Sequence, residues 1–84
     1  MTHDQFRETR EANPFRPFII HMTDGRSYPV PHRDFVSQAP AGRTIIVYRA
    51  DESFSILDLY LVNELEISAL PTTAEPPAPG ANGG

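Results

Sequence analysis

Residues 16–26, Arg-Pro-Phe-Ile-Ile-His-Met-Thr-Asp-Gly-Arg, are the stretch that decides the fold. They join a short apolar strand to an Asp-Gly turn signal, and a second strand, Ser-Tyr-Pro-Val, follows at residues 27–30. Asp-Gly between apolar runs favours a two-residue hairpin, because both residues adopt positive φ at low cost. The sequence therefore predicts a β-rich domain that begins with a hairpin.

Outward from this hairpin, the pattern predicts three further strands. Residues 44–49 form the clearest one, because they are dense in β-branched and aromatic side chains. Residues 54–57 and 62–67 give the others, separated by a tight 3₁₀-type turn at 58–61. An irregular or single helical turn is expected at 32–36 and a loop at 37–43. Alternation predicts a core built from the following side chains: Phe18, Ile20, Met22, Tyr28, Val30, Ile45 and Val47.

A short helix is expected before the hairpin, over residues 3–12. Thr2 and Gln5 have the spacing of a capping box, in which each side chain bonds the other residue's backbone N–H. Phe6 is the only large apolar residue of this helix, which must dock through it or fray. Pro14 ends the helix, because the residue before a proline disfavours α geometry. Pro29 predicts that the second strand lies at a sheet edge or at a bulge.

The composition bounds the class of protein. Eighty-four residues allow one domain, and the absence of cysteine excludes disulfides and thiolate metal sites. The net charge of −4 argues against broad nucleic-acid binding. Residues 71–84 are rich in Pro, Gly and Ala and are predicted to be a disordered tail. We therefore divide the chain into an N-terminal helix (1–13), a small β-barrel domain (14–70) and this tail.

At this size a closed five-stranded barrel is the expected way to remove exposed strand edges. A helix, five bent strands and a 3₁₀ turn before the last strand resemble the Sm-like and SH3-like small barrels. Asp24-Gly25-Arg26 is similar to the first Sm signature, although the uracil-stacking Asn of Sm proteins has no match here. Residues 14–67 also resemble a family of short bacterial proteins that carry Arg-Pro-Phe, Asp-Gly-Arg and Ile-Leu-Asp-Leu at these positions. The resemblance implies an architecture and no activity.

Polar side chains offer few catalytic or ligand-binding patterns. His21, His32 and Asp34 would suit a metal if they converged. We expect instead that His21 faces solvent and that Asp34 caps a turn, so neither a metal nor a cofactor is predicted. Asp58 interrupts an apolar run, and we expect it to cap the 3₁₀ turn by accepting backbone N–H bonds. The serines lie outside any nucleophile motif, which predicts a protein that is not an enzyme.

Two surfaces are candidates for binding. Arginines interleaved with aromatics suit single-stranded RNA, and the candidate contacts are Arg16, Arg26, Tyr28, Arg33 and Arg49. The acidic balance favours the alternative, in which nearby carboxylates neutralise scattered arginines. A cluster of apolar residues near the last two strands predicts an interface with a protein partner or a second copy, namely Leu57, Leu59, Tyr60 and Leu61.

The N-terminus lacks an apolar signal-peptide core, and no apolar run is long enough to span a bilayer, so we expect a cytoplasmic protein without membrane contact. The predicted function is a non-enzymatic protein-binding or self-associating module, with Sm-like RNA binding as the alternative.

Overall fold

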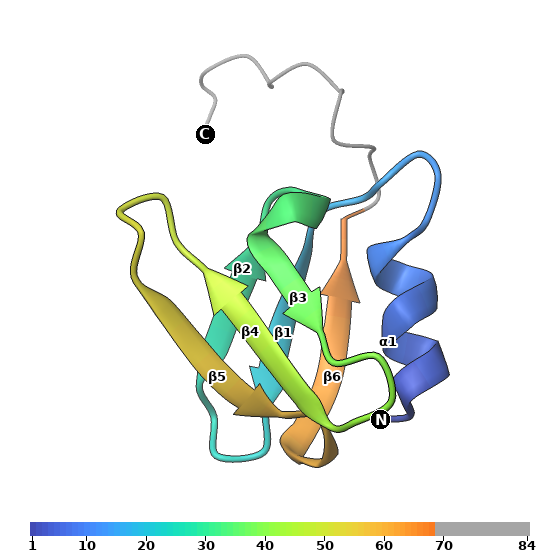
Figure 1. The fold of residues 1–84 in the computed structure, drawn as a ribbon, viewed down its shortest axis with the longest axis vertical. Coiled ribbons are helices and arrows are strands. Elements are labelled where there is room, and N and C mark those ends of the chain that lie inside the picture. The colour runs from blue at the N-terminus through green and yellow to red at the C-terminus, as the bar shows by residue number, and fades with distance from the viewer. Residues whose placement is uncertain (69–84) are drawn as a thin grey trace.

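A computed structural model describes residues 1–68, which form one helix, six strands and two 3₁₀ turns (Figure 1). In chain order these are α1 (His3–Arg10), β1 (Phe18–Met22), β2 (Ser27–Val30), η1 (Arg33–Phe35), β3 (Val36–Gln38), β4 (Thr44–Tyr48), β5 (Phe54–Asp58), η2 (Leu59–Leu61) and β6 (Val62–Ile67). The domain is thus mainly β with one N-terminal helix, as the sequence predicts. The predicted tail, 71–84, lies outside the described residues.

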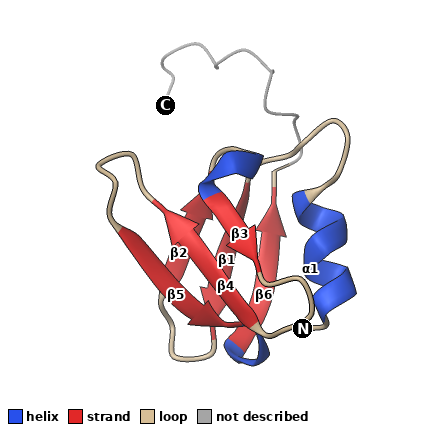
Figure 2. Cartoon of the chain, in the orientation of Figure 1, coloured by secondary structure: helices blue, strands red, loops and turns tan. Residues whose placement is uncertain are grey.

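The strands form two antiparallel sheets of three strands, ordered β2-β1-β6 and β3-β4-β5 (Figure 2). The expectation of a closed five-stranded barrel is therefore wrong, because no ladder within residues 1–68 joins the two sheets. The predicted loop at 37–43 was also too long, since β3 occupies its start. Pro31 and η1 separate β2 from β3, and the two strands lie in different sheets.

Alternation within the strands builds the core as predicted. In β1, Phe18, Ile20 and Met22 are buried while the residues between them are half-buried. Ile45 and Val47 are buried in β4, and Val30 in β2. Half-buried Tyr28 packs against this core, which is completed by Phe6, Phe15, Val36, Leu57, Leu59 and Val62.

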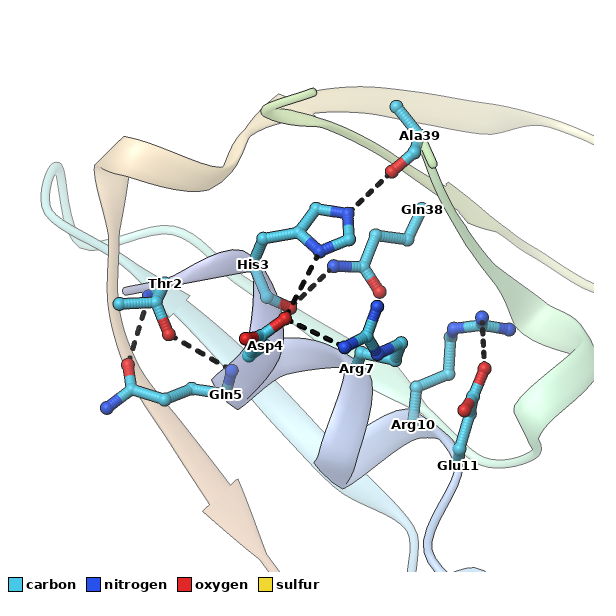
Figure 3. A network of polar contacts seen from close by, with 9 residues as sticks. All are labelled: Thr2, His3, Asp4, Gln5, Arg7, Arg10, Glu11, Gln38 and Ala39. Carbon is cyan, nitrogen blue, oxygen red and sulfur yellow. Dashed lines mark hydrogen bonds and ion pairs between the residues drawn. The ribbon is translucent and has the colours of Figure 1, made fainter. Parts of the chain in front are cut away.

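Helix α1 links the two sheets at one side of the molecule. The capping box is present, with Gln5 N–H donating to Thr2 Oγ1 at 3.1 Å and Thr2 N–H donating to Gln5 Oε1 at 3.0 Å. Phe6 is fully buried and packs edge-on against Phe18 of β1, with ring centroids 5.9 Å apart. On the other side, Gln38 Nε2 donates to the His3 carbonyl, as Figure 3 shows. The helix therefore docks through Phe6, as the sequence requires.

Candidate functional site

The five predicted RNA contacts do not form one patch of unpaired arginines. Arg26 Nε donates to Asp24 Oδ2 at 2.9 Å, and Arg49 donates to the hydroxyls of Ser53 and Ser55. Tyr28 and Arg49 both line a cavity of about 280 Å³ between β2 and the end of β4. The other two candidates lie elsewhere: Arg33 on η1 and exposed Arg16 before β1.

Arg33 serves an internal role. Its Nε donates to the Arg10 carbonyl at 2.9 Å, and its Nη2 donates to the Ala12 carbonyl at 2.6 Å. The guanidinium also lies over the ring of Phe15, 5.4 Å from its centroid. These contacts hold the chain that follows α1 against η1, so Arg33 is a structural residue.

The three side chains that would suit a metal, His21, His32 and Asp34, do not converge. His21 Nε2 donates to Glu66 Oε1 on β6 at 2.8 Å, whereas the exposed His32 lies against Phe35. Within residues 1–68, no group of three or more His, Asp or Glu side chains is placed to hold a metal ion. Asp34 lies in the first turn of η1.

Asp58 caps η2, as the sequence predicts, and has a second partner that the sequence analysis missed. Its Oδ1 accepts from Tyr60 N–H at 2.9 Å, and Arg43 forms a two-pronged contact to the carboxylate at 2.9 and 2.7 Å. The Arg43 guanidinium also stacks on the Tyr60 ring, 3.9 Å from its centroid. The Arg43 hydrogen bonds, followed by the Tyr60 N–H, lower the pKa of Asp58 below its usual value. The same pair raises the pKa of Arg43.

Arg43 and Tyr60 also line a surface cavity of about 410 Å³. Its other walls come from the N-terminus and the β3–β4 loop, including His3 and Gly42. His3 is held there by donating from Nε2 to the Ala39 carbonyl at 2.8 Å. The cavity thus joins an exposed aromatic ring to a guanidinium, although the Asp58 carboxylate neutralises that charge.

Apolar side chains gather on the outer side of sheet β3-β4-β5. Register places Ile46 opposite Ile56 and Tyr48 opposite Phe54, so all four share one side of the sheet. Phe54 is 56% exposed and Ile56 is 66% exposed. We call these four residues the β4–β5 face. Strand β5 carries apolar residues on both sides, so the sequence pattern did not indicate which side faces outward.

The predicted interface residues divide between core and surface. Leu57 and Leu59 are buried, which corrects the expectation that they form an exposed apolar edge. Tyr60 and Leu61 are 64% and 50% exposed and lie in η2, the turn that follows β5. The 3₁₀ geometry of η2 explains the division, because three residues per turn send only Leu59 inward.

Within residues 1–68, no helix has the length and apolar character needed to cross a membrane. Comparisons of the chain with protein-family models, curated proteins and solved structures gave no match.

Proposed function

We propose that this chain is a non-enzymatic, cytoplasmic module that works by protein contact through the β4–β5 face. The observation that carries the proposal is the register of β4 and β5, which gathers Ile46, Tyr48, Phe54 and Ile56 on one side. Contiguous apolar surface of this kind typically marks an interface in a small protein. Aromatic side chains are also enriched in the centres of protein interfaces.

The electrostatics of the surface support a binding role over catalysis. A general acid needs a carboxyl pKa raised towards neutrality. Three carboxyl groups show the opposite shift. The pKa of Asp24 is lowered chiefly by the Arg26 backbone N–H, that of Asp51 by the Ser53 side chain and that of Asp58 by Arg43. These groups are stabilised as surface anions.

We further propose that the architecture is a variant of the Sm/SH3-like small barrel. The strand order β2-β1-β6 and β3-β4-β5 supports this, because β2 and β3 follow one another with only Pro31 to Phe35 between them. Joining the sheets at that point gives one continuous path of strands. The resemblance to short bacterial proteins with Arg-Pro-Phe and Asp-Gly-Arg motifs is part of the same hypothesis.

A photo-crosslinking side chain tests the docking face. We expect p-benzoylphenylalanine at position 54 to yield a defined crosslinked protein in cells, identified by mass spectrometry. The matched control places the same side chain at Ile67, which is apolar and 47% exposed but lies on the other sheet. The product should disappear when Ile56→Ser is combined with the position-54 crosslinker. Equal products from positions 54 and 67 would contradict the proposal.

RNA binding is the second candidate, favoured by the stack of Arg43 on Tyr60. An exposed aromatic ring beside a guanidinium can stack a base and contact its phosphate. The adjoining cavity of about 410 Å³ is lined by residues of the N-terminus and of η2 and gives room for a base.

Fluorescence anisotropy with a uridine-rich oligonucleotide tests this second function. We expect binding to weaken steeply with salt if phosphate contacts contribute, and Arg43→Gln to weaken it further. Arg7→Gln is a matched control, because Arg7 is paired with Asp4 on α1. Affinity that does not change with salt or with Arg43→Gln would exclude this mode of binding.

A further inference from the structure

Within residues 1–68, strand β5 has backbone hydrogen-bonding groups along its outer edge that no other strand pairs. The Arg49 N–H donates to the Ser53 carbonyl at 2.9 Å, and the Leu59 N–H donates to the Arg43 carbonyl at 2.6 Å. Bonded pairs alternate in an antiparallel ladder, so between these two ends Ser55 and Leu57 bond to β4. The N–H and C=O groups of Phe54 and Ile56 therefore point away from β4. Strand β5 ends its sheet, as Figure 1 shows.

Strand β2 is the useful contrast, because its outer edge is blunted. The Met22 N–H donates to the Arg26 carbonyl, so every second residue of β2 from Arg26 onward hydrogen-bonds to β1. The backbone groups of Ser27 and Pro29 therefore point away from β1, towards the outer edge, and Pro29 has no N–H to donate there. Natural sheets commonly protect edges with proline, lysine or bulges. Strand β5, Phe-Ser-Ile-Leu-Asp, contains no proline or lysine.

We propose that β5 pairs antiparallel with β5 of a second copy of the chain, so that two three-stranded sheets become one continuous six-stranded sheet. This inference rests on the proposed function and names its partner. Phe54 and Ile56 supply both parts of the contact. Their backbone groups point to the open edge of β5, and their side chains lie on the β4–β5 face. In edge pairing of this kind, main-chain hydrogen bonds provide affinity, and the alternate side chains provide specificity.

One symmetric register fits these groups best. It places Phe54 opposite Ile56 of the second copy, with Ser55 on the two-fold axis. Each apolar side chain then faces an apolar partner, and every outward backbone group of Phe54 and Ile56 is bonded. In the same register Glu52 of one copy lies level with Asp58 of the other. These two carboxylates repel each other, and the Arg43 guanidinium, which contacts Asp58 and remains 55% exposed, offsets part of that repulsion.

Sedimentation velocity and residue-resolved amide exchange on the full chain test the pairing together. We expect a concentration-dependent dimer in which the amides of Phe54 and Ile56 become protected as the dimer forms. A monomer at all concentrations would overturn the pairing. A dimer in which both amides exchange as fast as in the monomer would overturn it equally.

Backbone methylation isolates the strand-edge hydrogen bonds. Chemical synthesis of the chain with N-methylated Ile56 keeps the side chain and the β4 ladder but removes the outward donor. We expect the dimer Kd to rise at least about tenfold. The matched control is N-methylated Ser27, whose N–H points outward from β2 and whose methylation should leave Kd unchanged. Amide exchange elsewhere in the chain checks that both proteins remain folded.

Different results would contradict the β5–β5 pairing and the proposed binding role of the β4–β5 face. A dimer that survives N-methylation of Ile56 but dissociates with Phe54→Ser would keep the β4–β5 face as docking surface and overturn the edge pairing. A monomer that still gives a position-54 crosslink to another protein would also keep the β4–β5 face as docking surface and overturn the edge pairing. Absence of both association and that crosslink would overturn the proposed function itself.

Discussion

Arg33 donates from Nη2 to the carbonyl of Ala12 at 2.6 Å and thereby ties η1 to the segment that leaves α1. Residues far apart in the sequence are thus joined by a charge-assisted bond to backbone. We expect Arg33→Ala to lower the free energy of unfolding by about 1–2 kcal/mol, measured by urea denaturation. Arg33→Lys should recover only part of it, because an ammonium cannot reproduce the fork or the stacking on Phe15. Full recovery by lysine would show that charge alone matters.

Substitution of Phe6, with exposed Phe54 as the comparison, tests how α1 is attached. Phe6→Ala removes a fully buried ring packed against Phe18 and should cost about 3–5 kcal/mol of unfolding free energy, with loss of helical circular dichroism. Phe54→Ala removes an exposed ring, and we expect a change of less than about 1 kcal/mol at concentrations where the chain is monomeric. Similar losses in both variants would mean that Phe54 also belongs to the core.

The two leucines of η2 should respond very differently to truncation. Leu59 is 1% exposed, so Leu59→Ala should destabilise the domain by about 2–5 kcal/mol. Leu61→Ala should change stability by no more than about 0.5–1 kcal/mol, because half of that side chain is already in water. Thermal unfolding of the two variants side by side measures the difference. Equal effects would contradict the inward direction assigned to Leu59.

Asp58 gives the domain a defined acid sensitivity. Because Arg43 and the Tyr60 N–H lower the pKa of Asp58 in the folded state, its ionised form stabilises the fold at pH values above the unfolded pKa. That contribution is lost as pH falls below about 3.8 and through the lowered folded pKa. We expect Asp58→Asn to be less stable than the wild type at pH 6 and the gap to narrow as the pH falls. A gap that is constant with pH would exclude this ionic contribution.

Sequence reasoning succeeded where one local rule dominates. The capping box of Thr2 and Gln5, the edge position imposed by Pro29 and the cap formed by Asp58 each depend on residues close in the chain. Alternation also found the buried face of β1 and β4.

It failed where side-chain direction depends on distant partners. The predicted interface cluster grouped Leu59 with Tyr60 and Leu61, although the three residues per turn of η2 send only Leu59 inward. Both sides of β5 are apolar, so the sequence could not indicate that Phe54 and Ile56 face outward. The Arg43–Asp58 contact joins residues fifteen positions apart, across a turn whose course the sequence left open. The prediction of a closed barrel was wrong because Pro31 and η1 separate β2 from β3, so the strands form two sheets.

The two sheets differ in how soon they can form during synthesis. Strands β3, β4 and β5 are consecutive and pair with their neighbours in the chain, whereas β1 must wait for β6 to pair at Ile20 with Leu65. Local pairings close shorter loops and form earlier on average. We therefore expect sheet β3-β4-β5 to be the folding nucleus, with Ile45→Val slowing folding more than Ile20→Val does. The nascent chain would then present its β4–β5 face before the N-terminal helix has a completed domain on which to dock.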